Sequence, residues 1–196
     1  VNRQSVFGSA GVLVHPTDFY VGAKPAGPTY FWQAGQAQPI DLIAVEPGGR
    51  RMPNVAVAGM LIRRGWHQVR RETDGYSQLV GEWVQDTVDR CQARTGAGAG
   101  CRLTPDKAGS YIVAFAAADR AGRAVSTSFY RWVIGPGWVP WADESQFKMD
   151  VVPDRSRYSV GDTATVLFAS PFTAAEAWVT VEREGLIEQR RLTISD

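Results

Sequence analysis

The chain has 196 residues, and its 21 lysine and arginine residues against 20 aspartate and glutamate residues leave a net charge of +1. This balance excludes the basic footprint that nucleic-acid binding needs. A hydrophobic content of 44% supports one or two domains with a substantial core. The longest apolar runs, such as residues 111–118, are far shorter than the ~20 residues of a membrane-spanning helix, so we expect no direct membrane insertion.

The sequence begins without methionine and has no basic region followed by an apolar stretch, the pattern of a secretory signal. It ends at Asp196, just after a strand-like run. We interpret it as a piece of a longer protein, so the lack of a signal leaves its compartment open.

The N-terminal region alternates short apolar runs with turn residues. Residues 11–15 form an apolar run that stops at Pro16. Residues 19–21 and 30–33 flank a stretch rich in proline and glycine. We interpret this region as a first strand followed by an irregular hairpin.

Three further runs predict strands before the cysteines. Residues 40–45 end at a Glu-Pro-Gly-Gly turn, and residues 55–66 form a longer strand. Asp74 and Gly75 are a turn signal. Residues 78–88 lack the regularity to exclude a helix, but their valine, tryptophan and threonine content favours a strand.

Cys91 and Cys101 are the only cysteines, and they flank a loop rich in glycine and alanine. A disulfide between the ends of this hairpin loop would contribute about 2–3 kcal/mol. Metal ligation is an alternative, weakened because only His15 and His67 are available and no CxxC spacing exists. Two free thiols are the remaining alternative. We predict the disulfide, and with it an oxidising compartment.

Residues 110–119 and 124–134 alternate apolar and small residues around an Asp-Arg-Ala-Gly turn, which predicts a β-hairpin. Roughly seven strands therefore fall in the first ~135 residues, separated by turn signals. This pattern is typical of an antiparallel β-sandwich of the immunoglobulin or fibronectin type III kind.

Residues 137–146 are rich in glycine, proline and acidic residues and predict a linker. Trp138 and Trp141 are candidates for packing this linker against one or both domains. An aromatic platform for a ligand is the alternative.

The sequence offers no credible catalytic site. His15 and His67 stand outside any motif that would bring them near a nucleophile. Ser145 and Lys148 fit S-x-x-K, but that motif needs the start of a helix and here lies in the predicted linker. The sequence lacks Walker, GxGxxG, HExxH and EF-hand motifs. We expect neither an enzyme nor a cofactor or metal site.

Residues 157–185 are the most distinctive stretch of the sequence, RYSVGDTATVLFASPFTAAEAWVTVEREG. Period-two alternation predicts one strand over residues 163–168 and another over 177–181, separated by a Ser-Pro stop. The amino-acid sequence of this stretch resembles the start of the bait-bearing macroglobulin domain in bacterial α2-macroglobulin-like protease inhibitors. The alternation of apolar and polar residues alone does not require the particular sequences SPF at residues 170–172 or VTVEREG at residues 179–185.

The resemblance implies a fold and a domain order. A macroglobulin-type β-sandwich would occupy residues 1–136, followed by the linker at residues 137–146. Residues 147–196 would be the first strands of the next, bait-bearing macroglobulin domain, which is incomplete here.

Members of this family that trap proteases covalently carry a Cys-x-Glu-Gln thioester motif on another domain. Residues 91–94 read CQAR, so no thioester is expected in this chain. The bait would also lie beyond it.

The resemblance also implies a function. The chain would be a structural segment of a protease inhibitor that traps proteases by conformational change after bait cleavage, located in the periplasm or cell envelope. Its partners would be target proteases, through the full-length protein, and neighbouring macroglobulin domains. An immunoglobulin-like adhesion or ligand-binding module is the alternative, and it predicts exposed aromatic side chains such as Trp138, Trp141 and Trp178.

About four strands in residues 147–196 are too few for a sandwich. Their expected inner face is apolar and consists of Val166, Phe168, Val179 and Val181. We predict that this half-domain packs against the first domain through the tryptophan-bearing linker, or pairs its open edge with another copy.

Overall fold

The computed structural model describes residues 7–73, 76–137, 139, 149–170 and 172–195. These residues form strands and loops, and none of them builds a helix that could cross a membrane. The all-β prediction is confirmed. The described strands are β1 (Tyr20–Pro25), β2 (Phe31–Gln33), β3 (Gln38–Val45), β4 (Ala56–Thr73), β5 (Tyr76–Arg94), β6 (Gly100–Leu103), β7 (Gly109–Ala118), β8 (Ala124–Ile134), β9 (Val151–Pro153), β10 (Val166–Phe168), β11 (Ala175–Glu182) and β12 (Leu186–Ile194).

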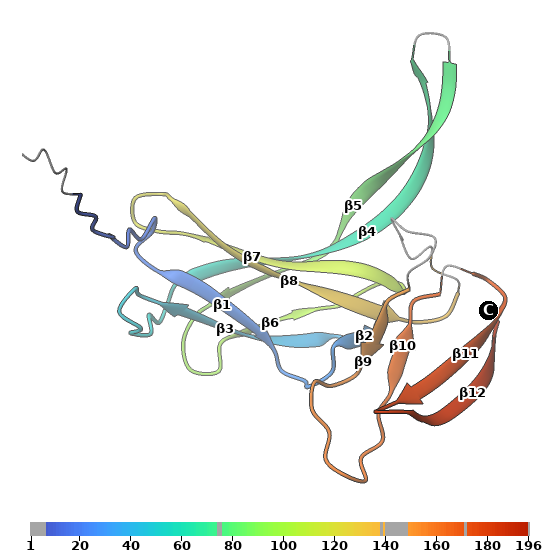
Figure 1. Ribbon diagram of the computed structural model, residues 1–196. Coiled ribbons are helices and arrows are strands. Elements are labelled where there is room, and N and C mark those ends of the chain that lie inside the picture. The colour runs from blue at the N-terminus through green and yellow to red at the C-terminus, as the bar shows by residue number, and fades with distance from the viewer. Residues whose placement is uncertain (1–6, 74–75, 138, 140–148, 171, 196) are drawn as a thin grey trace, which may run out of the picture.

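Strands β1 to β8 build the predicted sandwich from two sheets that lie over each other (Figure 1). One sheet has five strands in the order β2-β8-β7-β4-β5, and the other has three in the order β1-β3-β6. The pairings are antiparallel except that β2 runs parallel to β8.

The core lies between the sheets because alternate residues of the central strands point inward. In β3 these residues are Ile40, Leu42 and Ala44, each 1% exposed. In β7 they are Tyr111, Val113 and Phe115, which are equally buried. Fully burying one large apolar side chain stabilises the fold by about 1.5–3 kcal/mol, so these two strands anchor the sandwich.

The β7–β8 hairpin forms as predicted, with Ala118 opposite Ala124 at its turn. The buried carboxylate of Asp119 accepts hydrogen bonds from the backbone N–H groups of Ala121 and Arg123, both at 2.9 Å. Gly122 takes a φ of 77°, which favours glycine. The turn chemistry that the sequence indicated is therefore the chemistry that closes the hairpin.

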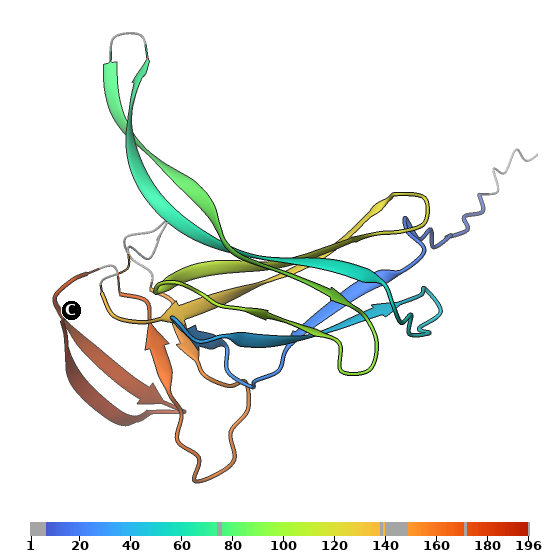
Figure 2. The ribbon, with the colours of Figure 1, turned by 180° about the vertical axis from the view of Figure 1, so that it is seen from behind.

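Strands β4 and β5 are longer than predicted. Their pairing runs from Ala56 opposite Arg94 to Thr73 opposite Tyr76, whereas β7 pairs with β4 only through residues 58–64. The outer half of the hairpin therefore leaves the sandwich as a curved two-stranded arm (Figure 2). Residues 78–88, for which the sequence did not exclude a helix, form part of strand β5. Asp74 and Gly75 lie outside the described residues.

Two predictions for the N-terminal region are wrong. Residues 11–15 form no strand, and Val12, Leu13 and Val14 are 79–86% exposed, because no neighbouring strand pairs with them. The expected irregular hairpin is also absent. β1 pairs with β3 in one sheet, and β2 pairs with β8 in the other.

The C-terminal region contains the four strands that were expected, as two two-stranded sheets, β9 with β10 and β11 with β12. The first predicted strand is shorter than residues 163–168 and comprises only β10. Val166, Phe168, Val179 and Val181 line one groove of about 490 Å³, as their expected common face requires. Val166 and Val181 remain 37% and 49% exposed.

Candidate functional site

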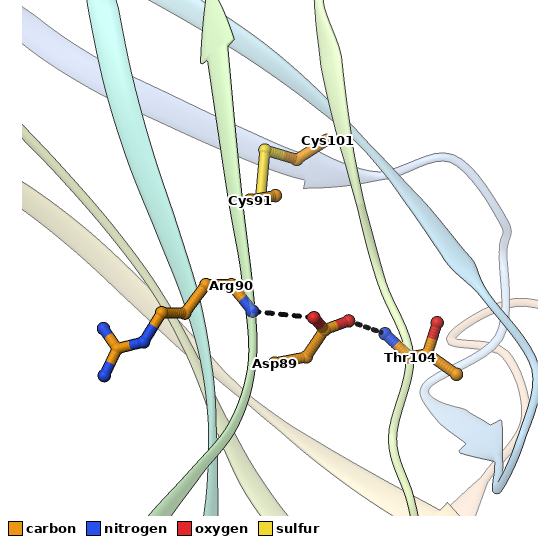
Figure 3. The surroundings of a disulfide bond; sticks show 5 residues. All are labelled: Asp89, Arg90, Cys91, Cys101 and Thr104. Carbon is orange, nitrogen blue, oxygen red and sulfur yellow. Dashed lines mark hydrogen bonds between the residues drawn. A yellow bond between two sulfur atoms is a disulfide. The ribbon is translucent and has the colours of Figure 1, made fainter.

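The two cysteines are joined in a disulfide, as predicted, with their Cα atoms 5.9 Å apart. Their place in the fold differs from the prediction. Cys91 lies in β5 of the five-stranded sheet, and Cys101 lies in β6 of the three-stranded sheet. The bond therefore ties the two sheets of the sandwich together and does not close a hairpin within one sheet (Figure 3).

A second connection between the sheets lies beside the disulfide. One oxygen of the Asp89 carboxylate accepts a hydrogen bond from the backbone N–H of Thr104, just after β6, at 2.7 Å (Figure 3). The other oxygen accepts one from the backbone N–H of Arg90, also at 2.7 Å. A covalent bond and a charged hydrogen bond thus hold the same two strands.

The disulfide requires a glycine on the neighbouring strand. A Cβ atom at Gly59 of β4 would lie 2.5 Å from Sγ of Cys91 and 2.6 Å from Cε1 of Phe115. Both contacts are far too short, so the close approach of sulfur and aromatic ring fixes glycine at this position. Both sulfur atoms take part in the disulfide, so these two cysteines are not available as metal ligands, which was the alternative.

Tyr111 anchors the start of β7 to the chain that leads into it. Its hydroxyl donates to Asp106 Oδ1 at 2.7 Å and lies 2.8 Å from the carbonyl oxygen of Lys107. Burial and the hydrogen bond to Asp106 raise the pKa of Tyr111 to about 12. A buried tyrosine that bonds back to the preceding backbone is the tyrosine corner of immunoglobulin-like sandwiches. Strand periodicity does not reveal this feature, whose signal in the sequence is the run DKAGSY at residues 106–111.

An ion pair extends the tyrosine corner to β4. Arg63 Nη1 lies 2.6 Å from Asp106 Oδ2. Partial burial of Asp106 acts to raise its pKa, but the Tyr111 hydrogen bond and the Arg63 charge outweigh it and lower the pKa below its usual value. The carboxylate therefore stays ionised while it holds both partners.

Among the described residues, the N-terminal sandwich and the C-terminal strands meet at Tyr30 and around one groove. The backbone N–H of Tyr30 donates to the carbonyl oxygen of Asp154 at 3.0 Å. A groove of about 350 Å³ is lined from one side by the end of β8 and the residues after it, and from the other by Leu167, Phe168 and Phe172. Trp138 and Trp141, the residues predicted to make this packing, lie outside the described residues.

Neither histidine is part of a catalytic arrangement among the described residues. His15 Nδ1 lies 2.8 Å from the Tyr20 hydroxyl, in an exposed pair. His67 is exposed on β4. Ser145 and Lys148 lie outside the described residues.

Trp178 is the remaining sequence candidate. It lies on β11 and is 65% exposed, with the Arg191 guanidinium 5.9 Å from its ring centroid. Among the described residues no second aromatic ring packs against it.

No protein-family model matches the chain. A curated relative does: the chain is 26% identical over 191 residues, 97% of its length, to an alpha-2-macroglobulin homolog from Nostoc sp.. The chain is thus similar to a segment of an alpha-2-macroglobulin over nearly its whole length. It spans 10% of the length of the Nostoc alpha-2-macroglobulin homolog.

Two solved alpha-2-macroglobulins are also similar to the chain. The native conformation of the E. coli protein is 18% identical, covers 92% of this chain and 13% of its own, and superposes with a TM-score of 0.49. The Salmonella protein reacted with methylamine is 16% identical, covers 92% of this chain and 12% of its own, and superposes with a TM-score of 0.44.

Proposed function

We propose that the chain is a structural segment of a protease inhibitor that traps proteases by a conformational change after bait cleavage. The observation that carries the proposal is the sequence match to an alpha-2-macroglobulin homolog over nearly the whole chain. A sandwich braced by a disulfide, a charged hydrogen bond and a tyrosine corner suits a segment that transmits movement as a rigid body.

We propose the same domain division that the sequence suggested. Residues 1–136 form the first macroglobulin domain, residues 137–146 form the linker, and residues 147–196 begin the next domain. The groove of about 490 Å³ between the two small sheets supports this division. It is lined by apolar side chains that a complete sandwich would cover.

The partners and the compartment follow from the same proposal. Neighbouring macroglobulin domains contact this segment, and target proteases meet the larger polypeptide. The disulfide supports a periplasmic or cell-envelope location, because disulfides persist in oxidising compartments.

An adhesion or ligand-binding module remains the weaker candidate. It needs several aromatic side chains grouped on one exposed face. Trp178, the sequence candidate for such a face, is exposed, but no second aromatic ring packs against it among the described residues.

The test compares the purified chain with the full-length polypeptide that contains it. The purified chain is expected neither to cleave casein nor to inhibit trypsin, because it is part of the structural frame and the bait lies elsewhere in the proposed inhibitor. The full-length polypeptide is expected to block trypsin from casein while leaving its activity on a small peptide substrate, since a trapped protease excludes large substrates only. Stoichiometric inhibition of trypsin by the isolated chain would overturn the proposal, and so would a full-length polypeptide without effect on any protease tried.

A further inference from the structure

The β4–β5 arm leaves a strand edge open. β7 pairs with β4 only as far as Arg64, which lies opposite Ser110. Beyond that point, over residues 65–73, β4 pairs with β5 alone among the described strands. None of the described strands pairs with the backbone on its other side, which can therefore receive an added strand.

An aromatic and arginine cluster covers one face at the base of the arm. The rings of Trp66 and Trp83 meet edge to face with centroids 5.3 Å apart. The Arg64 guanidinium lies 3.9 Å from the Trp83 ring centroid and 5.6 Å from that of Tyr130. A Cβ atom at Gly81, on the same face of β5, would lie 1.9 Å from Trp66, so glycine at this position makes room for the indole. The ring contact and the stacked guanidinium therefore hold the side chains of the cluster against one another.

The two faces of the arm differ in how their arginines are paired. On the face opposite the cluster, Arg63 pairs with Asp86 and Asp106, and Arg71 lies 3.6 Å from Glu82. Arg64 and Arg70 point to the cluster face, since they share the strand parity of Trp66. Neither has a carboxylate partner among the described residues, and Nε of Arg64 is buried without a hydrogen-bond acceptor.

We propose that this cluster face, together with the open edge of β4, binds an extended acidic segment of a protein. Main-chain hydrogen bonds to the edge would provide affinity, and carboxylates beside Arg64 and Arg70 would provide specificity. The two arginines are six residues apart on one strand, about 20 Å, so the partner needs carboxylates at a similar spacing. Tryptophan, tyrosine and arginine are the residues that dominate protein interfaces. A net charge of +1 gives no field for a nucleic acid.

The probe is a capped peptide of about ten alternating glutamate and valine residues, which extends over both arginines in a strand conformation. Its binding to the whole chain is measured by fluorescence anisotropy of an attached dye. The peptide is expected to bind saturably, and a matched lysine–valine peptide is not. Replacing Arg70 by glutamate is expected to weaken binding at least about tenfold, because one charge-assisted contact becomes a repulsion.

Arg71→Glu provides the control. It makes the same change in net charge one residue away on the opposite face and is expected to alter binding by less than about twofold, since it breaks only an exposed ion pair. Circular dichroism checks that both variants fold. Equal losses in the two variants would show a net-charge effect and overturn the proposal. Absence of saturable binding would also overturn it, as would a single-stranded oligonucleotide that binds in place of the acidic peptide. The inference does not rest on the proposed inhibitor function.

Discussion

Tyr111 concentrates several interactions of the sandwich in one side chain. It is fully buried, bonds to Asp106 and Lys107, and lies in β7 between β4 and β8. Its hydroxyl thus fixes where the chain from β6 turns into the central strand. Periodicity predicted the strand that carries Tyr111, but it could not reveal the hydroxyl bonds, because they depend on how residues 106–110 turn.

Replacing Tyr111 by phenylalanine is expected to lower the free energy of unfolding by about 1–3 kcal/mol, because buried hydrogen bonds to a charged group are lost. Urea unfolding measures the change. Tyr130→Phe is the control, since that side chain is 60% exposed on the neighbouring strand and is expected to change stability by less than about 0.5 kcal/mol. Equal effects in the two variants would show that the Tyr111 hydroxyl contributes nothing special.

The raised pKa of Tyr111 adds a dependence on alkaline pH. The folded protein holds the phenolic proton more tightly than the unfolded chain, whose tyrosine has a pKa of about 10. This contribution to stability is fully present below pH 10 and is lost as the pH rises towards the folded pKa of about 12. The phenylalanine variant should lack that part of the alkaline loss.

At the scale of elements, the sequence predicted the strands with one buried face best. β3, β7 and β8 carry clear alternation because one side of each meets the core. The arm was underestimated since both of its faces meet solvent. The run at residues 11–15 was overestimated, because an apolar run becomes a strand only where another strand pairs with it. The sheets to which Cys91 and Cys101 belong could not be predicted from a separation of ten residues.

The inter-sheet disulfide is an element-scale constraint with a measurable effect. Because the closed loop is short, replacing both cysteines by serine is expected to lower the free energy of unfolding by about 2–3 kcal/mol. Guanidinium unfolding of the variant and of the untreated protein measures the difference, and reduction of the untreated protein should reproduce it. Thiol titration of the unfolded, unreduced protein checks the bond itself. Two reactive thiols there would contradict the structure.

At the scale of the whole molecule, the two halves differ in how they are stabilised. The large buried cluster lies within the first sandwich, and of the C-terminal residues that the structure describes only Ala169 and Ser170 are buried. Residues 149–170 and 172–195 contribute small sheets whose apolar side chains stay partly exposed. The sequence predicted this imbalance from the number of strands, but the positions at which the halves meet depend on tertiary contacts that no local pattern encodes.

Excising residues 147–196 is therefore expected to give a poorly folded or aggregating peptide. The excised peptide loses the hydrogen bond between Tyr30 and Asp154 and the groove contacts around Phe168, and two-stranded sheets are marginal alone in water. It has no disulfide to compensate, since both cysteines lie in the first sandwich. The matched control is the peptide of residues 1–136, which keeps the core and the disulfide and should unfold cooperatively. Sedimentation and amide dispersion in NMR spectra distinguish the outcomes. A monomeric peptide of residues 147–196 with dispersed amide signals and a cooperative transition would mean that this region is a self-sufficient domain, and the boundary proposed at residues 137–146 would then separate two complete units.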